Sequence, residues 1–266
     1  MKLSIVFTII SMEECANVIQ SVNCIIQTLK GDDYEIIIIS DFDFEFKMFK
    51  DVSNIHIVIN KTPIGIFKSR QKSIKLAKGK YISFVNSNII TYVSDLTFID
   101  DENDYDIIRF NGKIEDNNRN HISIQNDLLS EDDVDEYVNL NPITSRFILK
   151  KYYNPFINNF MFKKDYVKEF YKKISIIENY NKLFDIYLIM GMMKYMTSFK
   201  YDLHVFGITI FNESYRMDNE KSKSFYGLNS EMYFDKAEFD ELKSYLENDN
   251  LNISKDVINF IEPYIK

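Results

Sequence analysis

The chain has 266 residues, of which 45% are hydrophobic, and its formal net charge is −8. This length and composition suit one large domain, or one domain with a small annex, and exclude a globally disordered chain. The acidic balance argues against a nucleic-acid partner. The two cysteines, Cys15 and Cys24, fall in one predicted helix on different faces, so neither a disulfide nor a metal site is expected from them.

The first predicted element is a strand over residues 3–10, a continuous apolar run of the kind that is buried on both faces in a parallel sheet. Ser11 is the predicted N-cap of the following helix, with Glu14 as its capping-box partner, and Gly31 is predicted to end that helix. A second buried strand is predicted over residues 35–39. The expected unit is β-α-β with a right-handed crossover.

A third short strand is predicted over residues 54–59, followed by a helix over residues 66–78. The polar face of that helix is expected to carry Lys68, Arg70, Lys72 and Lys75, and Gly79 to end it. The next strand spans residues 81–85 and runs into the polar turn Asn86-Ser87-Asn88. Ligands of open α/β sheets bind beyond the carboxyl ends of such strands. Three polar turns satisfy that rule, at residues 8–11, 40–43 and 86–88.

The pattern in the second half of the chain is weaker. A strand is predicted over residues 105–110, followed by a turn at Asn111-Gly112 and a partner segment at 122–124. Helices are predicted over 160–173 and 181–196, and a late strand over 205–211. Two short helices are predicted over 236–247 and 255–265. Acidic residues dominate from 95 to 136 and basic residues from 146 to 200. Two interpretations are open, namely two solvated faces, or a basic surface that faces anionic lipid or an anionic acceptor.

The N-terminal apolar run is too short for a signal peptide, and no apolar run approaches the length of a membrane span. The expected location is therefore the cytoplasm, including peripheral association with the inner face of the membrane.

The ordered pattern of the first ninety residues resembles a family 2 glycosyltransferase with the GT-A fold. The strand over residues 35–39 followed by Asp41 is similar to the family's second strand. The family's next block matches in order and nearly in spacing, at Asn60, Gly65, Arg70, Ala77, Gly79, Tyr81, Ile82 and Phe84. Where the family has a metal-binding Asp-x-Asp, this chain has Asn86 and Asn88. Two fainter matches follow, the acid Asp185 at a predicted helix and the pair Tyr215-Arg216.

The resemblance implies a mixed, mostly parallel central sheet flanked by helices, with a helical C-terminal part. It implies a glycosyltransferase domain over residues 1–215, with its nucleotide-sugar half at 1–95 and its acceptor half at 96–215, and a helical extension at 216–266. The implied partners are a nucleotide-sugar donor and a glycan or lipid-linked acceptor.

The site residues follow from the same resemblance. Asp185 is the expected general base of an inverting transfer. The expected nucleotide-sugar-binding residues are Thr8, Ile9, Asp41, Lys68, Arg70, Asn86, Ser87, Asn88, Tyr215 and Arg216. Asp41 would accept a hydrogen bond from the base or sugar, while Lys68 and Arg70 would face the diphosphate.

The Asn-Ser-Asn turn leaves the metal question open. The family's Mn²⁺ or Mg²⁺ would be coordinated here by Asn88, whose neutral carbonyl attracts a hard cation far less than a carboxylate does. Three interpretations remain. The enzyme neutralises the leaving diphosphate with Arg or Lys and no metal; Asp95 or another acid supplies the missing charge; or the site is inactive and the protein is a GT-A-like binding or scaffold protein. A nucleotidyltransferase is disfavoured, since residues 8–14 contain no glycine.

Overall fold

The computed structural model describes most of the first half of the chain and selected segments of the second half. The described residues are 1–44, 46–85, 87, 90–93, 96, 97, 99, 104–116, 160–174, 188, 189, 191, 192, 195–211, 236, 237, 240, 243, 244 and 262.

The first half forms four parallel strands. These are β1 (Leu3–Ile9), β2 (Tyr34–Ser40), β3 (Ile55–Ile59) and β4 (Tyr81–Val85), which lie in the order β3-β2-β1-β4. Three helical elements connect them: α1 (Glu14–Thr28), the 3-10 helix η1 (Lys47–Phe49) and α2 (Gly65–Leu76). Every residue of β1, β2 and β4 is buried, as their continuous apolar sequences predict.

The second half extends the same sheet. It adds β5 (Ile90–Val93), β6 (Ile107–Asp116), β7 (Phe160–Lys163), α5 (Lys164–Lys173) and β8 (Phe199–Phe211). Among the described residues the sheet has eight strands in the order β3-β2-β1-β4-β7-β6-β8-β5, and β7 joins antiparallel to β4. This mixed α/β architecture confirms the predicted fold class. The predicted helical C-terminal part and the domain limits depend mostly on residues outside the described ones.

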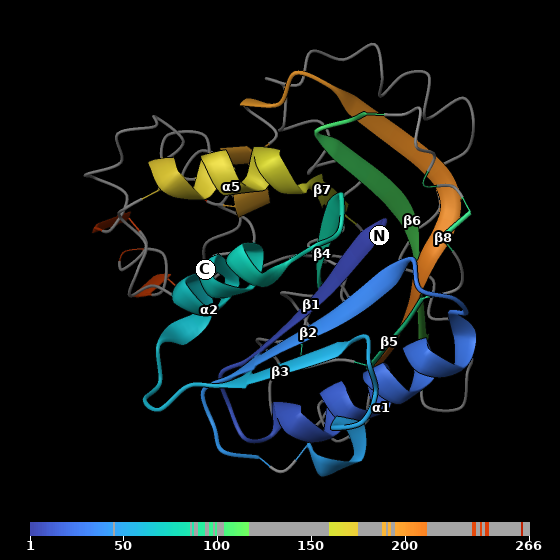
Figure 1. Ribbon diagram of the computed structural model, residues 1–266. Helices are drawn as coiled ribbons and strands as arrows, with labels where there is room; N and C mark the ends of the chain where they lie inside the picture. The colour runs from blue at the N-terminus through green and yellow to red at the C-terminus, as the bar shows by residue number, and fades with distance from the viewer. Residues whose placement is uncertain are drawn as a thin grey trace.

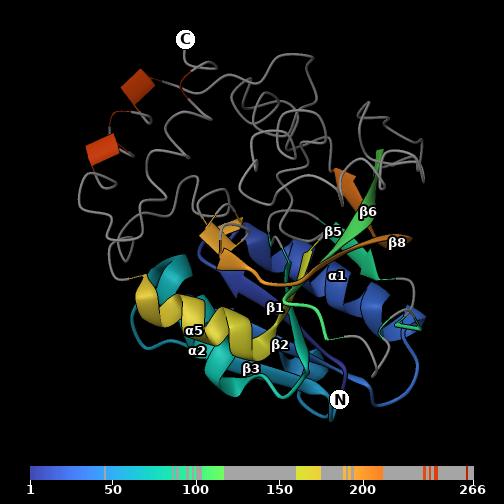
Figure 2. The same cartoon turned by 90° about the horizontal axis from the view of Figure 1, so that it is seen from above.

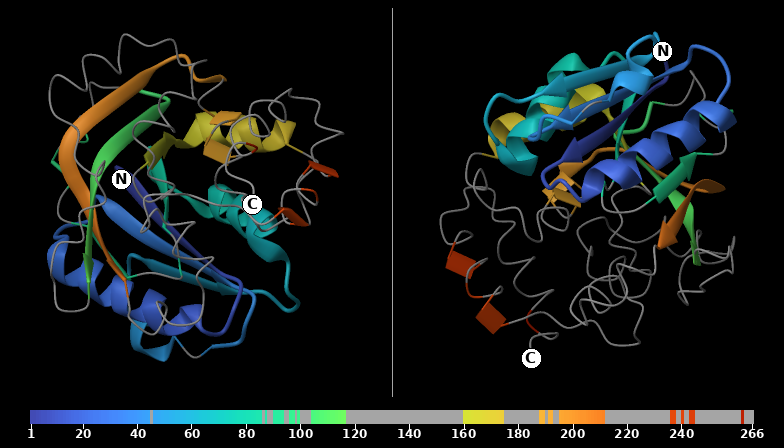
Figure 3. Two further views of the ribbon diagram at one scale, coloured as in Figure 1. Left: turned by 180° about the vertical axis from the view of Figure 1, so that it is seen from behind. Right: turned by 90° about the horizontal axis from the view of Figure 1, so that it is seen from below.

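The helices form two layers on the sheet (Figures 1 and 2). α1 and η1 cover one face, while α2 and α5 lie side by side on the other, and Figure 3 shows both layers from behind and from below. The α1 layer closes over the main hydrophobic core, which includes Ile5 and Phe7 of β1 together with Val18 and Val22 of α1. In the part of the chain that is described, no helix combines the length and the apolar character needed to span a bilayer.

The α2 and α5 layer rests on an aromatic cluster. Phe67 of α2 stacks on Tyr171 of α5 with ring centroids 5.4 Å apart, and Phe84 of β4 lies 6.2 Å from Phe162 of β7. The guanidinium carbon of Arg70 lies 5.1 Å from the centroid of Phe84. Arg70 is 2% exposed, so it belongs to the buried face of α2 and not to the polar face on which the sequence placed it.

A buried polar cluster joins the amino ends of the parallel strands. Glu35 of β2 is fully buried and accepts hydrogen bonds from Ser4 Oγ at 2.7 Å and from the Lys78 amide at 2.5 Å. The Gly79 amide donates to the same Ser4 hydroxyl at 2.9 Å. A Cβ at residue 79 would lie 2.5 Å from the backbone nitrogen of Ser4, so only glycine lets the chain pass this close to β1.

Several predicted boundaries are wrong. Helix α1 begins at Glu14, three residues after the predicted N-cap, and ends at Thr28, before Gly31. Gly31 adopts a φ of 88°, which explains the glycine without making it the helix end. Asn111-Gly112 is no turn, because β6 continues through it to Asp116 with register shifts against β8 at this point. The predicted pairing of 122–124 lies outside the described residues.

The predicted helix over residues 160–173 is two elements. Phe160 and Phe162 are spaced by two, stack on each other at 5.9 Å and belong to β7, while only Lys164–Lys173 is helical. The predicted strand 205–211 begins earlier, at Phe199. Strand β5 has no counterpart among the predicted elements.

Candidate functional site

Four of the predicted site residues meet at the carboxyl edge of the sheet. β1 pairs in parallel with both β2 and β4, so their carboxyl ends face the same way. The Asp41 amide donates to the carbonyl of Ile9 at 2.9 Å. Ser87 Oγ donates to the carbonyl of Thr8 at 2.7 Å. The turns after β2 and β4 are therefore both hydrogen-bonded to the last two residues of β1.

Asp41 lies at the centre of a hydrogen-bond network at this edge. Its side chain is buried, with 7% exposure. Oδ1 accepts from Asn60 Nδ2 at 2.8 Å, and Oδ2 accepts from the amides of Ile64 at 3.0 Å and Gly65 at 2.8 Å. These two amides begin α2, so the carboxylate caps the positive end of that helix. Gly65 has a φ of 76°, a left-handed conformation that favours glycine.

The network continues from Asp41 to a cation. Asn60, at the end of β3, accepts from Lys72 Nζ of α2 at 2.7 Å through its Oδ1. One chain of contacts thus fixes the ends of β2 and β3 and the first turns of α2. It gives Asp41 a structural role that requires no ligand, and the hydrogen bond to a nucleotide base or sugar stays a prediction.

Glu14 holds the loop after β1 and contacts the 86–88 turn. Its Oε2 accepts from the Ile10 amide at 2.8 Å and from the Ser11 amide at 3.3 Å. The Ser87 hydroxyl lies close enough to the same side chain to influence its pKa. Burial raises the pKa of the Glu14 carboxyl above its ordinary value, although the hydrogen bond from the Ile10 amide and the nearby Ser87 hydroxyl act to lower it. The sequence assigned Glu14 only to the capping box, so its contact with Ser87 was missed.

The two predicted diphosphate ligands on α2 lie in different environments. Lys68 is exposed in the first turns of α2, on the carboxyl side of the sheet. Arg70 is buried against the ring of Phe84. A role in diphosphate binding stays a prediction for both.

Five predicted site residues lie outside the described residues: Asn86, Asn88, Asp185, Tyr215 and Arg216. Their predicted roles are thus neither supported nor contradicted by geometry.

The predicted metal ligand, Asn88, lies outside the described residues. None of them form a group of three or more His, Cys, Asp or Glu side chains able to hold one. The acid beside Ser87 is Glu14, whose Oε2 already accepts hydrogen bonds from two backbone amides. Hard cations prefer charged oxygen ligands, which an Asn-Ser-Asn turn does not supply. Metal binding at the Asn-Ser-Asn turn therefore stays a prediction.

The strand order and the two helical layers agree with the predicted GT-A-like fold. The solved structures that it resembles include S. aureus TarS, residues 1–349, in complex with UDP, at a TM-score of 0.57 and 12% identity, covering 98% of this chain and 70% of that one. The complex of the same fragment with UDP-GlcNAc gives a TM-score of 0.60 and 14% identity, covering 98% and 71%. At these identities the likeness concerns the fold.

Against the longer TarS structure, the match covers 43% of that chain at a TM-score of 0.57. No protein-family model matches the sequence, and no curated protein matches it either.

Proposed function

We propose that this protein is a glycosyltransferase that moves a sugar from a nucleotide-sugar donor to a glycan or lipid-linked acceptor. The observation that carries the proposal is the convergence of Thr8, Ile9, Asp41 and Ser87 at the carboxyl edge of a GT-A-type sheet. In open α/β sheets this edge is where ligands bind. Structures of the same fold, those of S. aureus TarS, contain UDP and UDP-GlcNAc, which makes a uridine nucleotide the first donor to test.

In the proposed arrangement, the 1–95 half binds the donor and the 96–215 half shapes the acceptor side. The turns after β1, β2 and β4 contact the nucleotide. Tyr215 and Arg216 close over the diphosphate. Residues 216–266 form a helical extension, in line with the helical conformation of residues 236, 237, 240, 243 and 244.

The proposed chemistry is a single displacement that inverts the anomeric centre. Asp185 removes the proton of the acceptor hydroxyl, whose oxygen forms a bond to the anomeric carbon while the bond from that carbon to the diphosphate breaks. The leaving nucleoside diphosphate gains negative charge, which exposed Lys68 is suited to neutralise from the carboxyl side of the sheet. The transfer then needs little or no divalent metal.

The proposed location is the cytoplasm, with peripheral binding to the inner membrane face where a lipid-linked acceptor is presented. Three exposed lysines of the α2 and α5 layer support such binding, because they offer positive charge to anionic lipid: Lys75, Lys168 and Lys173.

The alternative is a GT-A-like protein that binds or scaffolds without transferring sugar. The observation that favours it is the loss of both carboxylates from the Asp-x-Asp position, at Asn86 and Asn88. One set of measurements separates the two functions.

The experiment combines binding and turnover. Calorimetric titration with UDP, and turnover with a panel of UDP, GDP, CMP and TDP sugars, are each measured with Mn²⁺ and with EDTA. The glycosyltransferase proposal expects nucleotide binding and donor turnover that survive EDTA. Binding without turnover of any donor favours the scaffold function. The absence of both with every donor refutes the nucleotide-sugar function.

A double variant tests the turn directly. Asn86→Asp combined with Asn88→Asp restores the two carboxylates, so metal-dependent activity should appear or increase if the pocket is otherwise intact. Asn23→Asp, on the exposed side of α1, adds a carboxylate away from the site and is the matched control. Equal metal responses of the two proteins would mean that the turn lies outside the donor site.

A further inference from the structure

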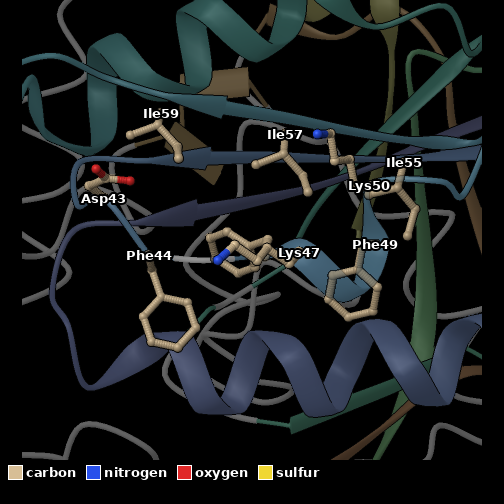
Figure 4. Close-up of a pocket in the computed structure, with 9 residues that line it drawn as sticks. Asp43, Phe44, Lys47, Phe49, Lys50, Ile55, Ile57 and Ile59 are labelled. Carbon is tan, nitrogen blue, oxygen red and sulfur yellow. The ribbon is translucent and has the colours of Figure 1, made fainter.

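An apolar groove lies along β3 at the edge of the sheet (Figure 4). It has a volume of about 380 Å³ and runs between β3 and the η1 segment. Six apolar side chains line it: Ile55, Ile57, Ile59, Phe44, Phe46 and Phe49. The candidate donor site does not use these side chains.

The groove adjoins an open strand edge. Among the described residues, β3 pairs with β2 alone and is the outermost strand. The Ile36 amide donates to the Asn54 carbonyl and the Asn60 amide donates to the Ser40 carbonyl, so even-numbered positions of β3 face β2. Backbone groups alternate in direction along a parallel strand, and the amides and carbonyls of Ile57 and Ile59 therefore point outward.

The edge strand lacks two features that often protect an open edge against pairing, namely proline and charged residues. Its sequence, Ile-His-Ile-Val-Ile, contains no proline and no Lys, Arg, Asp or Glu. Solvent reaches large apolar side chains here, since Ile59 is 41% exposed and Met48 of η1 is 58% exposed. An open edge with exposed apolar side chains is a template for another strand.

The charges at the groove are separated along its length. Asp43 lies at the Ile59 end and Lys50 lies toward the Ile55 end, with a second lysine, Lys47, between them (Figure 4). An antiparallel strand pair with a two-fold axis at Ile57 brings the Ile59 end of one chain opposite the Ile55 end of the other. The acidic end of each groove then approaches the basic end of its neighbour.

We propose that β3 pairs antiparallel with β3 of a second copy of this chain, about a two-fold axis at Ile57. The Ile57 amide of each copy donates to the Ile57 carbonyl of the other, and the Ile59 amide donates to the Ile55 carbonyl. The Ile55 amide takes no part, because it already donates to the Val52 carbonyl at 3.0 Å. The pairing joins the two sheets and covers half-buried Ile57 and exposed Ile59.

The separated charges are the reason to name a second copy as the occupant. A two-fold interface uses the same patch on both subunits and must therefore be self-complementary. A groove with an acid, Asp43, at one end and a lysine, Lys50, toward the other meets that condition at its two ends. A groove with charge of one sign throughout would repel its own copy.

Sedimentation velocity of the full chain over a range of concentrations tests the proposal. The wild type is expected to dimerise reversibly. Ile57→Lys puts a charge at the centre of the interface and should weaken the dimer at least ~100-fold. Val58→Lys, whose side chain leaves the opposite face of the same strand, is the matched control and should change dimerisation by less than about threefold. Far-UV circular dichroism checks that both variants are folded.

A charge exchange keeps the test independent of folding. Asp43→Lys and Lys50→Asp each place like charges opposite each other and should weaken the dimer about tenfold, while the double variant restores it to within about threefold of the wild type. A monomeric wild type at every concentration overturns the proposal. A dimer that tolerates Ile57→Lys also overturns it. The same holds if the effects of the two single charge variants add in the double variant, because either result places the contact elsewhere.

Discussion

The substitution Asp41→Asn tests whether the charge of the carboxylate, rather than the size and shape of the side chain, organises the candidate site. The carboxylate accepts from Asn60 Nδ2 at 2.8 Å and from the amides of Ile64 at 3.0 Å and Gly65 at 2.8 Å. An amide of the same size has one oxygen and one NH₂ group. Whichever way it turns, its NH₂ group faces a donor, so contact is lost either with Asn60 or with the start of α2.

The expected loss is the sum of two contributions. A hydrogen bond to a charged group contributes about 1.5–3 kcal/mol. A negative charge at a helix N-terminus contributes a further ~0.3–1 kcal/mol. Asp41 is only 7% exposed, so solvent replaces little of either. We expect Asp41→Asn to lower the free energy of unfolding by about 2–4 kcal/mol.

Urea unfolding at pH 7, followed by far-UV circular dichroism at one protein concentration, measures the change. The midpoint should fall while the slope of free energy against urea stays constant. Asp51→Asn removes an exposed carboxylate and is the control, with an expected change within ~0.5 kcal/mol. The reasoning is refuted if the Asp41 variant is as stable as the control.

Three further predictions concern neighbouring contacts. Gly79→Ala places a Cβ 2.5 Å from the backbone nitrogen of Ser4. It should lower the free energy of unfolding, measured in urea, by about 3 kcal/mol. An unchanged urea midpoint would contradict the close approach of residue 79 to β1. Glu14→Gln should alter the pH dependence of stability. The raised pKa of Glu14 means that the folded state holds the proton more tightly, so the wild type should lose stability relative to the variant as pH rises from 4.5 through that pKa, in unfolding curves at successive pH values. A relative gain over that window would contradict the burial of the carboxyl. Ser87→Ala removes the donor to the Thr8 carbonyl. It should weaken UDP binding severalfold in calorimetry and lower the free energy of unfolding by ~1 kcal/mol in urea. Unchanged UDP affinity would mean that this turn does not contact the nucleotide.

The first half of the fold could be predicted because its signals are local. The runs that form β1, β2 and β4 are apolar on both faces, a pattern that is typical of strands in a buried parallel sheet. Parallel strands place their carboxyl ends together, which is enough to bring Asp41 and Ser87 to the end of β1. The order of the strands in the second half depends on contacts between distant segments, and no local pattern encodes it.

The errors have physical causes that single residues illustrate. Arg70 was expected on a polar face, but its guanidinium lies over the ring of Phe84, and the nearby polar residues Ser69 and Ser73 are buried on the same helix. Asn111 and the glycine after it predicted a turn, whereas in the structure they lie at an irregularity within a long strand, β6. Glu14 was assigned to a capping box because of its spacing from Ser11, and its contact with the Ser11 amide agrees with that. Its second contact, with Ser87, joins segments far apart in the sequence, so spacing did not predict it.

The Asp41 carboxylate has a consequence for the energetics of ligand binding. Helix N-termini attract anions, and here the positive end of α2 already holds an anion that belongs to the chain. The protein therefore supplies its own counter-charge, and the ends of β2 and β3 are ordered before a ligand arrives. The entropy cost of ordering this corner falls on folding rather than on association, so a nucleotide would meet a surface already rigid on this side.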